Sequence, residues 1–334
     1  MREKKTLKKQ DLKGIPNISK LIGNTPIVPL KKITSGIPAK IFAKLEMYNP
    51  AGSLKDRLAN ALIENAEQSG QLKPGGTVIE VTSGNTGIAV AMVCAIKGYH
   101  ALLVMSDKNS QEKQNMMKLY GAELVLTPHT VQPDDPRSNY SVAEMLVKKT
   151  PNSIYLNQYD NPANIDCHYR TTGPEIWEQT GGDIECVVAG AGTGGTISGI
   201  GRYLKQKKPS IKVIAIDSQG SMLSHYFRTG EIIKAKHYEV EGIGSDKLIK
   251  AMDFSAIDDM IAISDKESFL TTRKIAQLEG IFCGGSSGAV LAGAIQAVEK
   301  YKITGNVVII FADSGNRYLS KLYSDKWMED KGYI

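Results

Sequence analysis

The stretch Glu185–Leu204, which reads ECVVAGAGTGGTISGIGRYL, decides the fold class. Its first five residues, Glu185–Ala189, are mostly apolar and predict a buried strand, whereas Thr196–Lys205 predicts a helix. The turn between them, Gly190–Thr196, contains four glycines, which let the backbone approach a phosphate at the start of the helix. This order of strand, glycine-rich turn and helix is typical of parallel α/β folds, in which ligands bind where strands end.

The same order recurs along the chain. Short β-branched or aliphatic segments predict strands at Lys40–Leu45, Thr77–Val81, Ala101–Met105, Glu123–Leu126, Cys186–Ala189, Lys212–Ile216 and Val307–Phe311. Helical patterns lie at Lys55–Ser69, Gly87–Lys97, Ser110–Tyr120, Ser141–Lys148, Thr196–Lys205, Lys266–Gln277 and Gly288–Lys300. We therefore predict two α/β domains that share a cleft, with a boundary near Leu156–Asn161 and a surface excursion at His129–Arg137.

The composition is that of a folded protein. Of the 334 residues, 42% are hydrophobic and 23% are charged, which excludes wholesale disorder. The longest apolar run, Gly87–Ile96, has about half the length that a membrane span needs, and no secretory signal opens the chain. The cysteines lie far apart, which argues against a zinc finger, an iron–sulfur cluster or a disulfide scaffold: Cys94, Cys167, Cys186 and Cys283. We expect a cytoplasmic chain without a membrane partner or a metal site.

The formal net charge of +6 does not indicate nucleic-acid binding. Residues 1–14 hold six basic and two acidic side chains, so the rest of the chain carries only +2. A short basic arm of this kind is typical of a solvated tail, with a docking role as the alternative. Without interleaved aromatic residues or a nucleic-acid-binding motif, we expect no nucleic-acid partner.

Lys55 is the first residue that could carry covalent chemistry. It lies in the turn Asn49–Arg57, at the start of a predicted helix, where the helix field favours anions rather than cations. The ordinary interpretation is a surface lysine paired with Asp56. The functional one is a reactive amine that forms a Schiff base with a carbonyl cofactor.

Two more helix starts are rich in small polar residues. Thr82–Gly87 presents hydroxyls and backbone amides that suit a carboxylate, although a plain helix cap has the same composition. In Cys283–Gly288, Ser286 is a candidate hydrogen-bond partner for a ring nitrogen, again with a cap as the alternative.

A dinucleotide site competes for the glycine-rich turn. Gly190, Gly192 and Gly195 satisfy the G-x-G-x-x-G spacing, and Asp217 ends the next strand 22 residues after the last of these glycines. That hypothesis predicts a nicotinamide-dependent oxidoreductase, but it leaves Lys55, Thr82–Gly87 and Ser286 without a role. A binding module without catalysis leaves them without a role as well.

Taken together, these loops resemble the fold-type II pyridoxal-phosphate enzymes, in particular the cysteine synthase and cystathionine β-synthase group. The resemblance runs from Ile18 to Ile334. The motifs that carry it follow the family's order: Gly23–Pro26, Asn49–Arg57, Thr82–Gly87, Gln158-Tyr159, Gly192–Thr196, Glu241–Gly244 and Gly284–Gly288.

The resemblance implies the tryptophan synthase β-like fold, with parallel central sheets in both α/β domains and the cofactor in the cleft. Residues 1–49 and 158–334 would form the larger domain, which binds pyridoxal 5′-phosphate. Residues 50–157 would form a smaller, mobile substrate domain that carries Lys55 and the Thr82–Gly87 loop. The family's usual state is a homodimer.

The resemblance also assigns roles to residues. Lys55 would hold the cofactor as a Schiff base and act as the general base. Asn85 would bond the ring 3′-oxygen and Ser286 the ring nitrogen, while the phosphate would rest on Gly192, Thr193, Gly194, Gly195 and Thr196. The remaining positions would bind substrate: Thr82, Ser83, Gly84, Thr86, Gln158, Tyr159, Glu241, Gly242 and Gly244.

The implied reaction is β-replacement, in which serine or O-acetylserine condenses with homocysteine to give cystathionine. Glu241 favours this product, because an acidic side chain at the cleft mouth can pair with the ammonium of homocysteine. The alternative is that Glu241 only braces the Gly242–Gly244 hinge. Ser245-Asp246 departs from the family, which usually has a tyrosine before the aspartate. A cysteine synthase using sulfide, or a variant that consumes cysteine, stays open. No Cys or His precedes Cys94, so no haem is expected.

Overall fold

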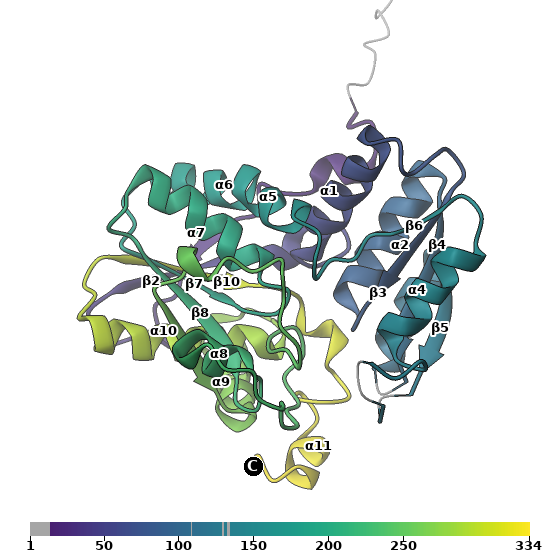
Figure 1. The fold of residues 1–334 in the computed structure, drawn as a ribbon. Coiled ribbons are helices and arrows are strands. Elements are labelled where there is room, and N and C mark those ends of the chain that lie inside the picture. Colours follow the sequence, from purple (N-terminus) through teal and green to yellow (C-terminus); the bar gives the residue numbers. More distant parts are fainter. Residues whose placement is uncertain (1–13, 108, 129, 132–133) are drawn as a thin grey trace, which may run out of the picture.

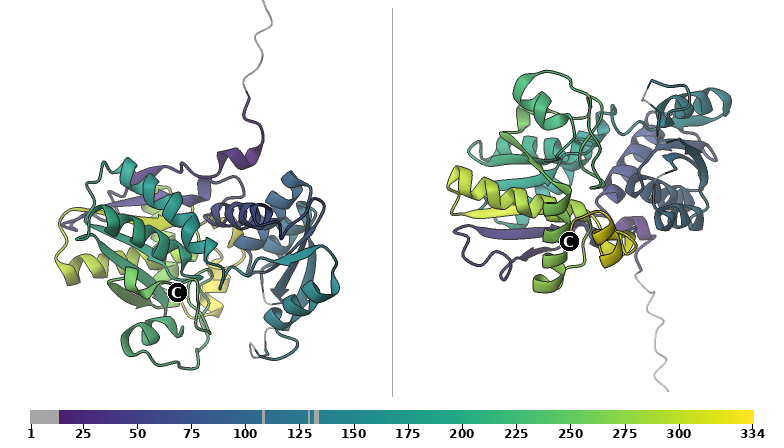
Figure 2. Two further views of the ribbon diagram at one scale, coloured as in Figure 1. Left: turned by 45° about the horizontal axis from the view of Figure 1, so that its top comes forward. Right: turned by 90° about the horizontal axis from the view of Figure 1, so that it is seen from below.

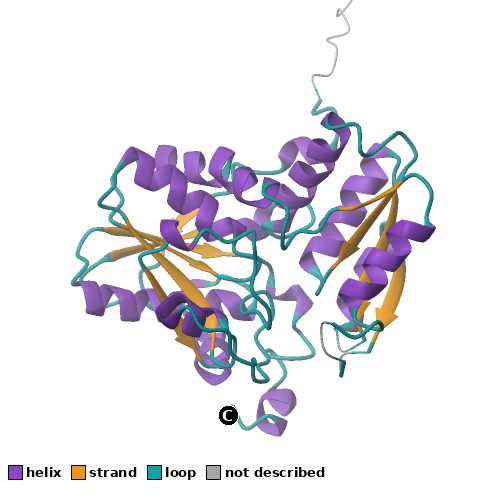
Figure 3. Cartoon of the chain, in the orientation of Figure 1, coloured by secondary structure: helices purple, strands orange, loops and turns teal. Residues whose placement is uncertain are grey.

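Two mainly parallel sheets, both covered by helices, make up the described part of the chain (Figures 1 and 3). The structure is a computed structural model that describes residues 14–107, 109–128, 130–131 and 134–334. Most of the basic arm and part of the expected excursion His129–Arg137 lie outside the described residues.

The larger sheet has six strands and the smaller sheet has four. In spatial order, the larger sheet consists of β1 (Ile27–Pro29), β2 (Lys40–Leu45), β10 (Asn306–Phe311), β7 (Cys186–Gly190), β8 (Lys212–Ser218) and β9 (Asp259–Ile263). Only its edge strand β1 pairs antiparallel. The smaller sheet is parallel throughout and consists of β5 (Glu123–Thr127), β4 (His100–Ser106), β3 (Thr77–Val81) and β6 (Ser153–Tyr155).

The helices divide between the two sheets. Those associated with the smaller sheet are α1 (Lys55–Gln68), α2 (Asn85–Lys97), α3 (Gln111–Leu119) and α4 (Asn139–Lys149). The others are α5 (Ala163–Arg170), α6 (Thr172–Gln179), α7 (Gly195–Lys207), α8 (Leu223–Thr229), α9 (Asp265–Glu279), α10 (Gly285–Tyr301) and α11 (Asp325–Asp330). Helix α1 contacts both α2 and α5, so it connects the smaller sheet to the larger one (Figure 2).

Apolar residues cover both faces of each sheet, because neighbouring residues along a strand point to opposite sides. In β7, Val188 packs on the side of α10, and Val187 packs on the side of α7. In β4, Leu103 packs with α1 and α2, and Leu102 packs with α4. Strands buried on both faces explain why their sequences are continuous apolar runs.

The predicted elements are confirmed, and the fold class with them. Each of the seven expected strands and seven expected helices is present, with ends within three residues of the prediction. The sequence reasoning missed β1, β6 and β9, of which β1 and β6 have only three residues. It also missed α5 and α6, which follow one another directly and contain Gly173 and Pro174. These two residues weaken the helical pattern.

The carboxyl ends of the parallel strands place four loops near one another. Strand β7 leads into the glycine-rich turn, β3 into Thr82–Gly84, and β2 into the segment before Lys55. Strand β10 leads into Ala312–Ser314. In open α/β sheets this edge is where ligands bind. Among the described residues, no helix is both long and apolar enough to cross a membrane.

Candidate active site

A cavity with about 400 Å³ of empty space lies at the carboxyl ends of β7 and β10. Its walls come from the start of α1, the glycine-rich turn, the loop at Gly242 and the first turns of α10. The cavity brings together seven of the residues selected from the sequence: Lys55, Gly192, Thr193, Gly194, Thr196, Gly242 and Ser286. Gly195 is buried behind the turn, as the first residue of α7.

Lys55 faces this cavity from the first position of α1. Burial lowers the pKa of its amine to about 8, against the partial opposing effects of the Asp313 carboxylate and the Cys167 thiol. The alternative interpretation, a surface pair with Asp56, is excluded, because Asp56 is fully buried and accepts a hydrogen bond from the Ala51 amide at 2.5 Å. Near neutral pH, a larger fraction of the Lys55 amine is therefore neutral than of an exposed lysine.

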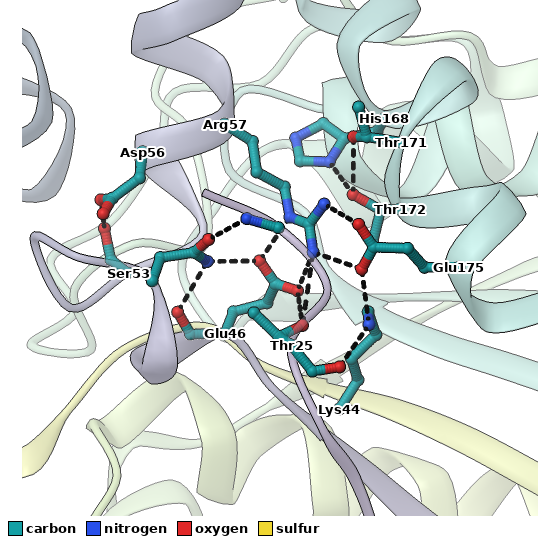
Figure 4. Close-up of polar contacts among 12 residues, drawn as sticks. Thr25, Lys44, Glu46, Ser53, Asp56, Arg57, His168, Thr171, Thr172 and Glu175 are labelled. Carbon is teal, nitrogen blue, oxygen red and sulfur yellow. Dashed lines mark hydrogen bonds and ion pairs between the residues drawn. The ribbon is translucent and has the colours of Figure 1, made fainter. Parts of the chain in front are cut away.

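A buried ion cluster anchors the helix that carries Lys55 (Figure 4). Arg57 donates to both carboxylate oxygens of Glu46, at 2.7 and 2.9 Å, and to both of Glu175, at 2.6 and 2.7 Å. Lys44 pairs with Glu175 at 2.9 Å, so two cations balance two anions. Burial opposes the ionisation of Glu175, but the two cations hold its pKa at about 2. These pairs join α1, the end of β2 and α6.

The glycine-rich turn forms a cradle in which the backbone lies close to its neighbours. Gly194 has φ +80, and a side chain there would collide with Met252. A side chain at Gly192 would run into the carbonyl of Gly242, and one at Gly195 would run into Asn164. No side chain caps the first turn of α7, so its N–H groups are free to bind an anion.

The two threonines of the cradle have side-chain partners that the sequence did not reveal. Asn164 donates to the hydroxyl of Thr193 at 3.0 Å. The hydroxyl of Thr196 lies 3.1 Å from Nε2 of His168, whose Nδ1 lies 2.9 Å from the hydroxyl of Thr172. Burial, reinforced by Lys55 and Arg57, lowers the pKa of His168 to about 3. A neutral imidazole therefore orients Thr196.

The loop after β3 carries the residues expected to bind a substrate carboxylate. Thr82 accepts hydrogen bonds from the amides of Gly84 and Gly87, both at 2.9 Å, so its hydroxyl caps α2. Thr86 donates to Gln158 at 2.7 Å, which brings these two expected residues together. Ser83 is exposed. Tyr159 lies beside Tyr140, with the Lys247 ammonium over both rings.

Ser286 lines the cavity, and Asn85 lies near it through its contact with Asp313, two residues after β10. Ser286 belongs to the first turn of α10. Asn85 begins α2 and donates through Nδ2 to Asp313 at 2.7 Å. Sequence reasoning missed Asp313, although it lies only two residues after a predicted strand.

Glu241 has two partners that the sequence did not reveal. Both of its carboxylate oxygens are already engaged, one by the ammonium of Lys113 and the other by that of Lys321 at 2.7 Å. Burial opposes its ionisation, yet the two lysines hold the pKa of Glu241 at about 2. The three side chains together carry a formal charge of +1. In this structure the lysines thus occupy both oxygens that the predicted pairing with a substrate ammonium would use.

The structure removes the support for a dinucleotide site. Asp217 is fully buried, and its two oxygens accept the amides of Ser218 and Ser224 at 2.9 and 2.7 Å. It is therefore not available to bind a ribose. In the described part of the chain, no group of three His, Cys, Asp or Glu side chains could hold a metal ion.

Comparisons with known proteins agree with this geometry. The model of the family described as "Pyridoxal-phosphate dependent enzyme" matches residues 18–313. The chain is 45% identical to the cystathionine beta-synthase of Apis mellifera over 96% of its own length and 64% of that protein. It is 43% identical to the cystathionine beta-synthase of Rattus norvegicus over 96% of its own length and 58% of that protein. The chain thus spans about three fifths of these curated relatives.

A solved structure shows the same similarity. The crystal structure of O-ureido-L-serine synthase superimposes with a TM-score of 0.85 at 34% sequence identity. The match covers 94% of this chain and 99% of that one. The expected fold-type II architecture is therefore confirmed along nearly the whole chain.

Replacing Arg57 by methionine should destabilise the protein strongly, because it leaves two buried carboxylates with too little positive charge. We expect a loss of about 3–5 kcal/mol in the free energy of unfolding, measured by urea denaturation. The matched control is Lys97→Met, which breaks a half-exposed pair with Glu67 and should cost less than about 1 kcal/mol. Equal losses of unfolding free energy in the two variants would show that the buried cluster contributes no more to stability than an exposed ion pair.

The lowered pKa predicts an unusual reactivity of Lys55. In the full chain freed of any bound cofactor, acylation of Lys55 should rise with pH around a midpoint near 8, because only the neutral amine is nucleophilic. Competitive acetylation followed by peptide mass spectrometry measures this, with the exposed Lys40 as the internal reference. A midpoint near 10.5 would mean that burial does not act on Lys55.

Proposed function

The chain belongs to the family of pyridoxal-phosphate dependent enzymes, and we propose that it condenses serine or O-acetylserine with homocysteine to give cystathionine. The observation that carries this proposal is the position of Lys55, which faces an uncapped helix start across one cavity. The two relatives named above as cystathionine beta-synthases support this product.

The residues of the cavity fit pyridoxal phosphate. The Gly192–Thr196 cradle excludes side chains and offers backbone N–H groups to a phosphate. Asn85 keeps a buried Oδ1, which is an acceptor, without a hydrogen-bond partner among the described residues, and this suits a donor group of a bound ligand. Its Nδ2 bonds Asp313 and has a second N–H that can donate to a ring oxygen. We propose that Asn85 meets the ring oxygen, that Ser286 meets the ring nitrogen, and that Lys55 forms the covalent bond. The cofactor, when bound, supplies a carbonyl that condenses with amines and a ring that delocalises the electron pair left at Cα.

The chain's own residues would then carry the steps of binding and proton transfer. The substrate carboxylate would lie at the start of α2, held by Thr82, Ser83, Gly84 and Thr86 together with Gln158 and Tyr159. Lys55 would remove the proton from Cα through Nζ, since with a pKa of about 8 roughly a tenth of this amine is neutral at pH 7. Gly242 and Gly244 would border the path of the second substrate. Gly244 is held to the glycine-rich turn by its N–H bond to Ala191 at 2.7 Å.

The arrangement of the two sheets supports one domain that binds the cofactor and another that binds the substrate. All strands of the smaller sheet come from residues 77–155, and those of the larger sheet come from residues 27–45 and 186–311. We propose that residues 50–157 form the substrate domain and that residues 1–49 with 158–334 form the cofactor domain. Four buried free thiols support a reducing cytoplasm. A homodimer is proposed on the family resemblance alone.

Reductive trapping tests the function directly. Borohydride treatment of the chain loaded with pyridoxal phosphate should fix the cofactor on the peptide that contains Lys55. Lys55→Ala should trap nothing there and lose turnover by about a thousandfold or more, because it removes both the covalent anchor and the base. Lys97→Ala is the matched control and should behave as the unmodified chain. Product analysis with homocysteine, sulfide and cysteine then identifies the nucleophile, and trapping on another lysine would contradict the assignment of Lys55.

Glu241→Gln tests what the acidic residue does at the cleft. Because its carboxylate joins Lys113 of α3 to Lys321 near the C-terminus, we expect kcat/KM to fall by about tenfold for homocysteine and sulfide alike. The control is Glu239→Gln, which breaks a pair with Lys331 and should change neither value. A loss confined to homocysteine would instead show that Glu241 leaves its lysines and binds the substrate ammonium.

A further inference from the structure

We propose that Asp313 is a positioning residue for the reaction: its carboxylate holds the amide of Asn85 and provides the negative charge that faces Lys55. The inference rests on the proposed function and assigns a residue that neither the sequence motifs nor the family resemblance had singled out.

The backbone places Asp313 between two loops that reach the cavity. On one side, Leu54 donates its amide to Ala312 at 2.9 Å, and Ser53 forms a bridge with Asp313. On the other side, Gly284 donates to the carbonyl of Asp313 at 3.1 Å, just before Ser286. Asp313, the second residue after β10, therefore connects the Lys55 loop to the Ser286 loop through its backbone.

The carboxylate of Asp313 is almost fully buried, with 1% of the residue exposed. Its Oδ2 accepts from Nδ2 of Asn85 at 2.7 Å and from the hydroxyl of Tyr318 at 2.6 Å. Its Oδ1 has no hydrogen-bond partner among the described residues. A buried carboxylate with one unpaired oxygen is costly, so its retention beside the cavity calls for a functional reason.

The pairing determines which way Asn85 points. A carboxylate can only accept hydrogen bonds, so it selects the NH₂ side of the amide and excludes the flipped orientation. The amide retains a second N–H, which is the donor that the ring oxygen of the cofactor requires. Tyr318 holds Oδ2 from another direction and so limits the freedom of the carboxylate. Asp313 thus acts on the cofactor through Asn85.

Asp313 is also the countercharge of Lys55. Besides Asp313, the Cys167 thiol on α5 affects the pKa of this amine, and the charge of Lys55 in turn lowers the pKa of His168 on the same helix. Burial raises the pKa of Cys167 to about 12 and lowers that of His168 to about 3, so neither is charged near neutral pH. The charge of Arg57, close to His168, is balanced by Glu46 and Glu175. Around Asp313 itself lie Tyr318, Cys283 and Tyr323, whose pKa values are all raised by burial, so these groups stay neutral as well.

Asp313→Asn removes the charge while keeping the shape. In the full chain freed of cofactor, the midpoint of Lys55 acylation should fall by about one pH unit, because the neutral amine is no longer disfavoured by an adjacent anion. In the loaded enzyme, the dissociation constant of pyridoxal phosphate should rise about tenfold. Asp259→Asn is the matched control, since Asp259 is also buried and paired with a tyrosine hydroxyl, but on β9 away from the cavity. It should move neither value.

Two further variants separate charge from position. Tyr318→Phe keeps the Asp313 carboxylate but removes the hydrogen bond from the tyrosine hydroxyl. The midpoint of Lys55 acylation should therefore stay unchanged, while the affinity for pyridoxal phosphate falls two- to fivefold. Asn85→Ala and Asp313→Asn should weaken affinity by similar factors, and the double variant should be no weaker than either single one, because the two act as a unit. Additive losses, or an unchanged Lys55 midpoint in Asp313→Asn, would overturn the proposal.

These experiments distinguish a failure of the Asp313 proposal from a failure of the proposed function. If borohydride fixes no cofactor on Lys55 in the unmodified chain, the proposed function fails. If it does, and Asp313→Asn binds and titrates as the unmodified chain does, only the role of Asp313 fails. Should Asp313→Asn not fold, as judged by circular dichroism, then Tyr318→Phe and Asn85→Ala decide, and unchanged cofactor affinity in both counts against the proposal.

Discussion

The position of Lys55 depends on the ion cluster around Arg57. This guanidinium lies two residues after the lysine and binds Glu46 and Glu175 with four hydrogen bonds. Burying these charges is expensive, so the cluster adds little net stability, but each group is satisfied only in one geometry. The cluster therefore specifies how the first turn of α1 meets the larger sheet. A lysine with an altered pKa is useful only if its amine is held in one place, and this cluster holds it.

Backbone groups set the electrostatic field on one side of the cavity, and side chains set it on the other. On the phosphate side, the field comes from N–H groups at the start of α7, and the neighbouring His168 is kept neutral by burial. On the amine side, burial lowers the pKa of Lys55 while Asp313 limits the shift. A phosphate bound at this helix start would need no basic side chain, so no second ammonium would compete with Lys55 beside the reacting carbon. The lysine that faces the cavity can then serve as the reacting amine rather than as a phosphate ligand.

Local patterns were enough to predict the fold and the loops of the site. Strands buried on both faces give continuous apolar runs, and glycine-rich turns mark where such strands pass into helices, so both are visible within a few residues. The polar partners are not, because they join distant parts of the chain: Asn85 and Asp313 are 228 residues apart, and Lys113 and Glu241 are 128 apart. The alternative that paired Lys55 with Asp56 fails for a related reason, since Asp56 follows the lysine in sequence but accepts a hydrogen bond from a backbone amide.

The pairing of Glu241 changes how the cleft should be understood. Lys113 comes from α3 beside the smaller sheet, packs against Gly84 and lies 4.7 Å from the ring centre of Tyr318. Its partner Glu241 comes from the larger unit and also binds Lys321 near the C-terminus. Only glycine fits at position 84, because a Cβ there would overlap the lysine side chain. The loop that would bind the substrate carboxylate is therefore packed directly against the charges that join the two units. The Lys113–Glu241 pair therefore ties the segment at the start of α2 to the loop at Gly242 and to Lys321.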